Sequence, residues 1–102
     1  MTYTTDDDTS IGIYTRAKAE WGTVQSEHGI LALTQQAYVS DTGMHYLALA
    51  MDPFGNRYRV TWETTPEWDE AKEEYLSTGD VGILDDESNA CDWTHPRRVI
   101  RI

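Results

Sequence analysis

The sequence predicts an α+β domain, in which an antiparallel β-meander sheet of four to six strands has one acidic amphipathic helix, at about 66–77, packed on it. Three observations predict this class. Residues 44–64 carry a hairpin signal, Thr65 begins a well-capped helix, and short apolar runs separated by turn residues flank both. A chain of 102 residues suits one hydrophobic core, so residues 1–102 are expected to form a single domain, with 1–10 as a flexible N-terminal tail.

The elements before the hairpin have weaker signals. Residues 11–15 are interpreted as a first strand, although Ser10 could instead cap a short helix through YTRAKAEW. Residues 21–25 form a second short strand, which ends at the turn SEHG. Residues 30–39 favour a strand, but the Ala, Leu and Gln content of ILALTQQAYV also suits a helix, and periodicity alone cannot decide.

Residues 44–64 form the clearest local pattern, two strands joined by a tight turn. The turn Asp52–Gly55 combines an acceptor side chain, a proline with φ fixed for a type I turn, and a glycine able to adopt positive φ. Along the second strand, side chains alternate between two faces, which is typical of a half-buried strand. The inward face carries Tyr58, Val60 and Trp62, and the outward, exposed face carries Arg57, Arg59, Thr61 and Glu63.

The helix that follows has clear signals at both ends. Thr65 is its predicted N-cap, Pro66 occupies its first position, and Gly79 stands just beyond its end. One stripe of the helix is apolar and is expected to dock on the sheet, whereas acidic residues occupy the outward arc. The stripe comprises Trp68, Ala71, Tyr75 and Leu76. Residues 80–84 and 97–102 are then expected to be the closing strands.

Acidic residues are concentrated in one segment. The formal net charge is −10, and residues 63–92 contain eleven acidic residues but only one basic residue, Lys72. On the predicted helix, like charges stand four apart, as in Asp69 with Glu73, and each such pair costs about 0.2–0.5 kcal/mol. Such a surface repels nucleic acid and anionic lipid and attracts basic surfaces.

The candidate partner-binding residues are the carboxylates of this segment and one tryptophan that follows them. Acidic faces often serve only solubility, and for Trp93 a packing role beneath a loop is an equal alternative. In the functional interpretation the carboxylates occupy a basic groove of a protein, because side chains three or four apart on a helix lie ~5–6 Å from each other, a density comparable to that of phosphates. The candidates are Glu63, Glu67, Asp69, Glu70, Glu73, Glu74, Asp80, Asp85, Asp86, Glu87 and Trp93.

Basic residues form two short clusters that would line up as a stripe if their strands pair. The negative net charge outweighs these clusters, so we expect no direct binding of nucleic acid. The clusters are Arg57 with Arg59, and Arg97 with Arg98 and Arg101.

Catalytic and metal-binding motifs are incomplete. Residues 85–89 (DDESN) begin like a calcium loop, but Ala90 and Pro96 stand where the motif needs Gly and Glu. Cys91 lies near His95 in the sequence, but nearby acidic residues raise the pKa of a thiol and no oxyanion-hole segment is present. A buried Cys91 beside a packed Trp93 accounts better for these residues. We therefore expect no enzyme, no metal and no cofactor.

The sequence indicates a cytoplasmic setting. Cys91 is the only cysteine, so an intramolecular disulfide is excluded, and the N-terminus lacks the features of a signal peptide. The longest apolar run, 46–51, is far shorter than the ~20 residues of a membrane span.

The favoured hypothesis is a non-enzymatic acidic protein that binds a basic, nucleic-acid-binding protein. The acidic protein is expected to be a monomer or a weak homodimer. Its composition is comparable to that of phage and mobile-element inhibitors that mimic nucleic-acid charge against host defence effectors of the anti-CRISPR or anti-restriction type. Two alternatives stay open: an accessory or structural module whose acidity only serves solubility, and a small hydrolase that uses a Cys/His pair or a metal.

Overall fold

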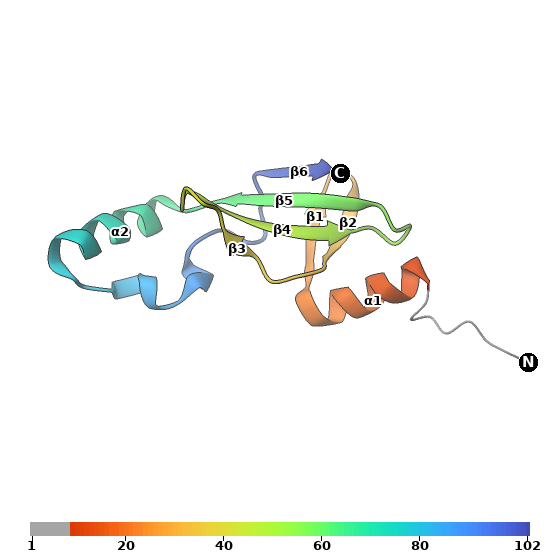
Figure 1. Ribbon diagram of the computed structural model, residues 1–102, viewed down its shortest axis with the longest axis horizontal. Coiled ribbons are helices and arrows are strands. Elements are labelled where there is room, and N and C mark those ends of the chain that lie inside the picture. Colours follow the sequence, from red (N-terminus) through yellow and green to blue (C-terminus); the bar gives the residue numbers. More distant parts are fainter. Residues whose placement is uncertain (1–8) are drawn as a thin grey trace, which may run out of the picture.

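The structure, a computed structural model, describes residues 9–102, so most of the predicted flexible tail lies outside the described residues. Within that range the chain forms helices at both ends of one antiparallel sheet (Figure 1). The α+β class is therefore confirmed. In chain order the elements are α1 (Ser10–Trp21), β1 (Thr23–Ser26), β2 (Gly29–Leu33), β3 (Tyr38–Val39), β4 (His45–Met51), β5 (Arg57–Glu63), α2 (Pro66–Thr78), the 3₁₀ helices η2 (Gly82–Asp85) and η3 (Glu87–Asn89), and β6 (Arg98–Arg101).

The β4–β5 hairpin is the centre of the sheet. Its strands pair along their whole length, from His45 opposite Glu63 to Met51 opposite Arg57. The strand order is β1-β2-β4-β5-β6, and β3 pairs with β4 beside β2. The strands expected at 21–25 and 97–102 are confirmed as β1 and β6. The alternation predicted for β5 is also confirmed, since its aromatic face is buried and its arginine face is exposed.

The segment at 30–39 is a strand at its two ends and bends in between. β2 pairs with Ala50 and Met51, near the end of β4, and β3 pairs with the beginning of the same strand. Between them, the Thr34 N–H and hydroxyl both donate hydrogen bonds to the Leu49 carbonyl, at 2.9 and 3.2 Å. The strand prediction therefore holds for β2 and β3, and the helical alternative does not.

Helix α1 replaces the strand expected at 11–15, so that prediction was wrong. The alternative, a helix through YTRAKAEW, is confirmed, except that its N-cap is Thr9 rather than Ser10. The Thr9 hydroxyl accepts a hydrogen bond from the Gly12 N–H at 2.9 Å. The helix packs on β2, where Ala17 is buried in a small cluster with Ala32 and Met51. This segment is a helix because one of its faces is buried against the sheet. The local alternation of apolar residues does not predict that burial.

Residues 80–84 form no strand, and this prediction was also wrong. Gly79 ends α2 in the left-handed conformation, with φ of 75°. The Asp80 carboxylate then accepts a hydrogen bond from the Gly82 N–H at 3.2 Å, just before η2 begins. The chain consequently turns back beside α2, and of this apolar run only Leu84 packs against the main core.

The main core lies on the inner face of a curled sheet. Tyr58, Val60 and Trp62 of β5 are buried on this face. β1 and β2 run across the direction of β4 and β5 (Figure 1), and the ring of His28, in the turn between β1 and β2, lies 5.0 Å from that of Tyr58. The first hairpin therefore covers one end of the core. Cys91, also buried, belongs to the segment that covers the other end.

Helix α2 extends beyond the end of the sheet instead of lying across it (Figure 1). Of its predicted apolar stripe, only Trp68 is buried in the core; the exposed fractions of Tyr75 and Leu76 are 47% and 85%. The prediction that the stripe docks on the sheet is therefore right for the first turn and wrong for the later turns. Within residues 9–102, no helix is long and apolar enough to cross a membrane.

Candidate functional site

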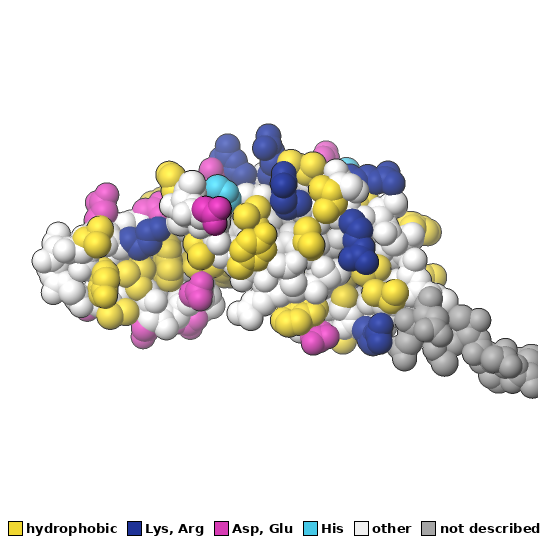
Figure 2. All heavy atoms as spheres, viewed as in Figure 1, with side chains coloured by type: hydrophobic (Ala, Val, Ile, Leu, Met, Phe, Trp, Pro, Cys, Tyr) yellow, Lys and Arg dark blue, Asp and Glu magenta, His cyan; other side chains and the backbone are white. Residues whose placement is uncertain are grey.

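The acidic residues gather at one end of the molecule. We use the name acidic arm for residues 66–89, which comprise α2, η2 and η3. Acidic side chains are concentrated over this end in Figure 2, whereas most of the basic side chains in that view lie over the sheet. The protein thus separates its charges along its length.

Polar contacts fix the base of the acidic arm. The Asp69 carboxylate accepts a 2.6 Å hydrogen bond from the Thr64 hydroxyl, and Lys72 donates one of 2.8 Å to the Gly43 carbonyl. Just before the arm, Glu63 forms an ion pair with Arg97 at 2.9 Å. Two of the candidate carboxylates, those of Glu63 and Asp69, are therefore engaged within the molecule.

Three further candidates stabilise the chain after α2. Glu87 accepts a 2.6 Å hydrogen bond from the Tyr46 hydroxyl, whose pKa is raised by burial and by that carboxylate. Asp86 accepts a 2.9 Å hydrogen bond from the Ser88 N–H, which lowers the pKa of Asp86. Together with the turn at Asp80, these contacts show that part of the acidic sequence shapes the arm itself.

The remaining candidate carboxylates face solvent. Among residues 9–102, none of them takes part in a hydrogen bond or an ion pair. A charged partner could therefore bind them without first breaking an internal contact. They are Glu67, Glu70, Glu73, Glu74 and Asp85.

An acidic groove lies between α2 and the segment that turns back beside it. It has a volume of about 260 Å³, smaller than the ~300–1,000 Å³ of small-molecule sites. Its apolar lining includes Val81 and Ile83, which are 43% and 39% exposed. Carboxylates supply most of the other side chains. They are Glu67, Glu70, Glu74 and Asp80.

Trp93 is half-buried and packs within the molecule. Its indole N–H donates to the Ser88 carbonyl at 2.9 Å, and its own carbonyl accepts the indole N–H of Trp62 at 3.1 Å. Its ring also meets those of Tyr46 and Trp62 edge-on, with centroids 5.4 and 5.2 Å away. These contacts are those of a residue that fixes the returning chain on the core, and they favour the packing role for Trp93.

Cys91 and His95 lie in different environments. Burial, together with the charge of Asp69, raises the pKa of the Cys91 thiol to about 11. His95 is exposed, and its Nδ1 lies 2.8 Å from the Asp92 carboxylate. The thiol is thus protonated at neutral pH, and the prediction of a buried Cys91 is confirmed.

No metal centre emerges from the part of the chain that the structure describes. Across residues 9–102, no group of three or more His, Cys, Asp and Glu side chains is arranged to hold a metal ion. Within the DDESN sequence, Asp86 instead caps η3.

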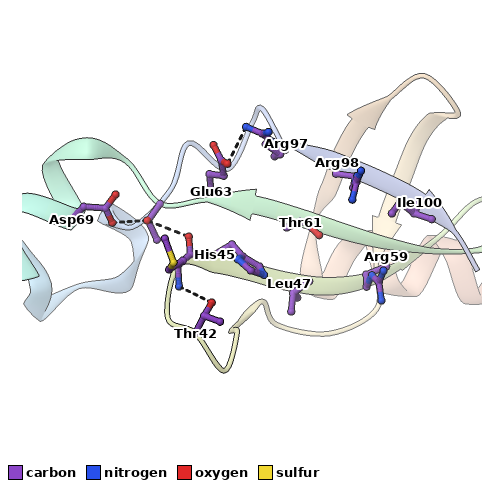
Figure 3. A pocket seen from close by; sticks show the side chains of 12 residues that line it. Thr42, His45, Leu47, Arg59, Thr61, Glu63, Asp69, Arg97, Arg98 and Ile100 are labelled. Atoms are coloured by element: carbon purple, nitrogen blue, oxygen red, sulfur yellow. Dashed lines mark hydrogen bonds and ion pairs between the residues drawn. The ribbon is translucent and has the colours of Figure 1, made fainter.

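A second hollow, which the sequence did not predict as a site, lies on the outer face of the sheet. We call it the arginine hollow; its volume is about 910 Å³ and it is open to solvent. Figure 3 shows Arg59 and Arg98 at one end, on β5 and β6, and Asp69 at the other end, on α2. One signal in the sequence could have indicated this hollow. The two arginine clusters were expected to form a stripe if their strands pair, and β5 does pair with β6.

Strand register explains why these two arginines are neighbours. Arg59 stands opposite Ile100, and Thr61 stands opposite Arg98. Arg59 and Arg98 are therefore diagonal neighbours on one face, a relation in which long side chains can reach each other. Within residues 9–102, neither guanidinium group has an ion-pair or hydrogen-bond partner.

No family model, curated protein or solved structure matches this chain. A function therefore has to follow from the geometry and charge of its own residues.

Proposed function

We propose that this protein is a non-enzymatic binding protein whose acidic groove receives basic side chains from a protein partner. The observation that carries the proposal is the groove itself, which combines four carboxylates with an apolar lining. Lys and Arg side chains have a matching composition, because a charged head ends a long apolar stem. An acidic face that only keeps a protein soluble does not need such a lining.

The energetics favour a charged partner over a neutral one. Glu67, Glu70 and Glu74 stand three or four residues apart on one side of α2, so their like charges repel. An arriving guanidinium would relieve this repulsion and form charge-assisted hydrogen bonds, which are about twice as strong as neutral ones. The groove carboxylates of α2 are unpaired within the described chain, so no internal bond must break first.

The kind of partner follows from the charge pattern. A projecting helix with closely spaced carboxylates offers the charge density of a nucleic-acid strand to a surface built for phosphates. We therefore propose a nucleic-acid-binding protein as the partner, with the acidic arm occupying its basic groove in a cytoplasmic setting. A host defence effector of the CRISPR or restriction type, inhibited by a phage or mobile-element protein, fits this role.

The experiment compares two variants with the same change in net charge. The groove variant carries Glu67→Lys, Glu70→Lys and Glu74→Lys. The control variant carries Glu20→Lys, Glu27→Lys and Asp41→Lys, three exposed positions outside the arm. Each protein is immobilised and used to capture proteins from a host lysate, with circular dichroism to verify folding.

The wild type and the control should capture a basic protein that is released by high salt and by added duplex DNA or RNA. The groove variant should capture none of it. If both variants lose the partner equally, the net charge of the protein, and not the acidic groove, determines binding. If neither loses it, the acidic groove is not the binding site, and the arm serves solubility.

A further inference from the structure

The arginine hollow reaches α2 at Asp69, on the side of the helix opposite the carboxylates of the acidic groove. Arg59 and Arg98 form its basic end, and Asp69 stands at its other end (Figure 3). One helical turn beyond Asp69, on the same side of α2, lies Glu73, followed three residues later by Leu76. The Glu73 carboxylate has no hydrogen-bond or ion-pair partner among the described residues, and Leu76 is 85% exposed. Basic residues of the sheet, at one end of the hollow, are thus followed beyond its other end by an acidic and an apolar residue of α2.

The guanidinium groups of Arg59 and Arg98 are available to a partner. They are diagonal neighbours across β5 and β6, and neither has a carboxylate partner within residues 9–102. The half-buried Leu47 and Ile100 lie in the same hollow. Charged groups that surround apolar side chains are typical of an interface.

We infer that the arginine hollow is covered by a second copy of this chain, related to the first by a two-fold axis. A surface with opposite charges at its ends becomes complementary to itself when it is rotated by half a turn. Arg59 and Arg98 of each copy then face Glu73 of the other. Leu76 of each copy then lies against the basic end of the other, near Ile100, so apolar surface is buried at both ends of the interface.

The net charge of −10 does not prevent this association. At about 0.1 M salt the Debye length is ~10 Å, so the repulsion between distant parts of the two copies is largely screened. Direct contacts between arginine and carboxylate act at much shorter range and persist. The dimer is independent of the proposed function, because it uses a different surface. Glu67, Glu70 and Glu74 remain free in the acidic groove to bind another protein.

Sedimentation velocity of the full chain tests the inference. Across a concentration series at about 0.15 M salt, the wild type should form a reversible dimer that weakens at about 1 M salt. The variant with Arg59→Glu and Arg98→Glu should raise the dimer dissociation constant at least about tenfold. Arg57→Glu is the matched control, because Arg57 lies on the same strand but outside the hollow, and it should dimerise like the wild type.

The opposite change identifies the partner of the arginines. Glu73→Lys should weaken the dimer on its own, and mixing it with the Arg59→Glu, Arg98→Glu variant should restore a heterodimer. Circular dichroism checks that each variant folds. A wild type that sediments as a monomer at every concentration overturns the inference, and so does a dimer that survives both reversals. Either result leaves the lysate experiment on the acidic groove unaffected.

Discussion

Asp52 shows how one buried carboxylate holds the central hairpin. It is 6% exposed, and its two oxygens accept hydrogen bonds from the Phe54 and Asn56 N–H groups, the Asn56 amide and the Tyr58 hydroxyl. Burial alone would raise the pKa of Asp52, but these hydrogen bonds lower it below 3.8. The sequence predicts the turn and its acceptor side chain. It does not predict the hydrogen bond from the Tyr58 hydroxyl to Asp52, because that bond depends on the pairing of β4 with β5.

Asp52→Asn should destabilise the protein by about 1–3 kcal/mol, because the new amide group cannot accept the bonds made to one carboxylate oxygen. Since folding lowers the pKa of Asp52, its ionised form contributes stability above the ordinary pKa of 3.8. That contribution is lost as the pH falls through the lower pKa of the folded state. The difference in unfolding free energy between wild type and variant, measured in urea, should therefore shrink in acid. A difference that is unchanged at pH about 3 would contradict this account.

The Cys91 thiol should react slowly in the folded protein. Its pKa is raised to about 11 by burial and by the charge of Asp69. At pH about 8 this leaves roughly one hundredfold less thiolate than an exposed cysteine would have, and the thiolate is the reacting form. Alkylation by iodoacetamide, followed by mass spectrometry, should be fast in urea and slow without it. Equal rates in both conditions would show that the thiol is accessible in the native state.

At the scale of elements, local signals predicted the structure wherever local contacts decide it. α2 follows its caps: the Thr65 hydroxyl accepts the Trp68 N–H at 3.2 Å, and Gly79 ends the helix. α1 was mistaken for a strand because its identity depends on burial of Ala17 against distant residues. The segment at 80–84 was mistaken for a strand. The chain instead turns at Gly82 and returns beside α2, and it does not reach the sheet.

Removing the cap of α2 should loosen the acidic arm. Thr65→Ala removes the acceptor for the Trp68 N–H, and loss of such a cap costs ~1 kcal/mol. Thr65→Ser keeps a hydroxyl and serves as the control. Thermal unfolding followed by circular dichroism should show a lower melting temperature for Thr65→Ala only. Equal melting temperatures for all three proteins would mean that the cap contributes nothing to stability.

For the whole molecule, charge was predicted better than shape. The sequence located the acidic segment and the exposed arginines of β5, because composition and period-2 alternation are visible in it. It did not reveal the acidic groove, since Val81 and Ile83 reach α2 only through the turn that follows Gly79. Nor did it show that α2 leaves the outer face of the sheet uncovered, because the direction in which a helix leaves a strand depends on packing.

The purified protein should bind neither duplex nor single-stranded DNA. The net charge of −10 repels phosphates, and the basic residues on the sheet are too few to overcome it. A gel shift at about 50 mM salt, where electrostatic attraction is strong, should show no complex. The variant Glu67→Lys, Glu70→Lys, Glu74→Lys tests how far charge alone decides the result. A micromolar complex with the wild type would contradict charge mimicry as its mode of action.

The acidic arm begins and ends at neighbouring points of the sheet. Thr64 and Cys91 form an antiparallel bridge, and the Thr65 N–H donates to the Ala90 carbonyl at 2.8 Å. The whole arm is thus an insertion between β5 and β6, two strands that are already partners. Such an excursion can lengthen, shorten or be exchanged without changing the order of the strands. With Trp68 retained as the residue that enters the core, it could be grafted into the loop of another antiparallel hairpin.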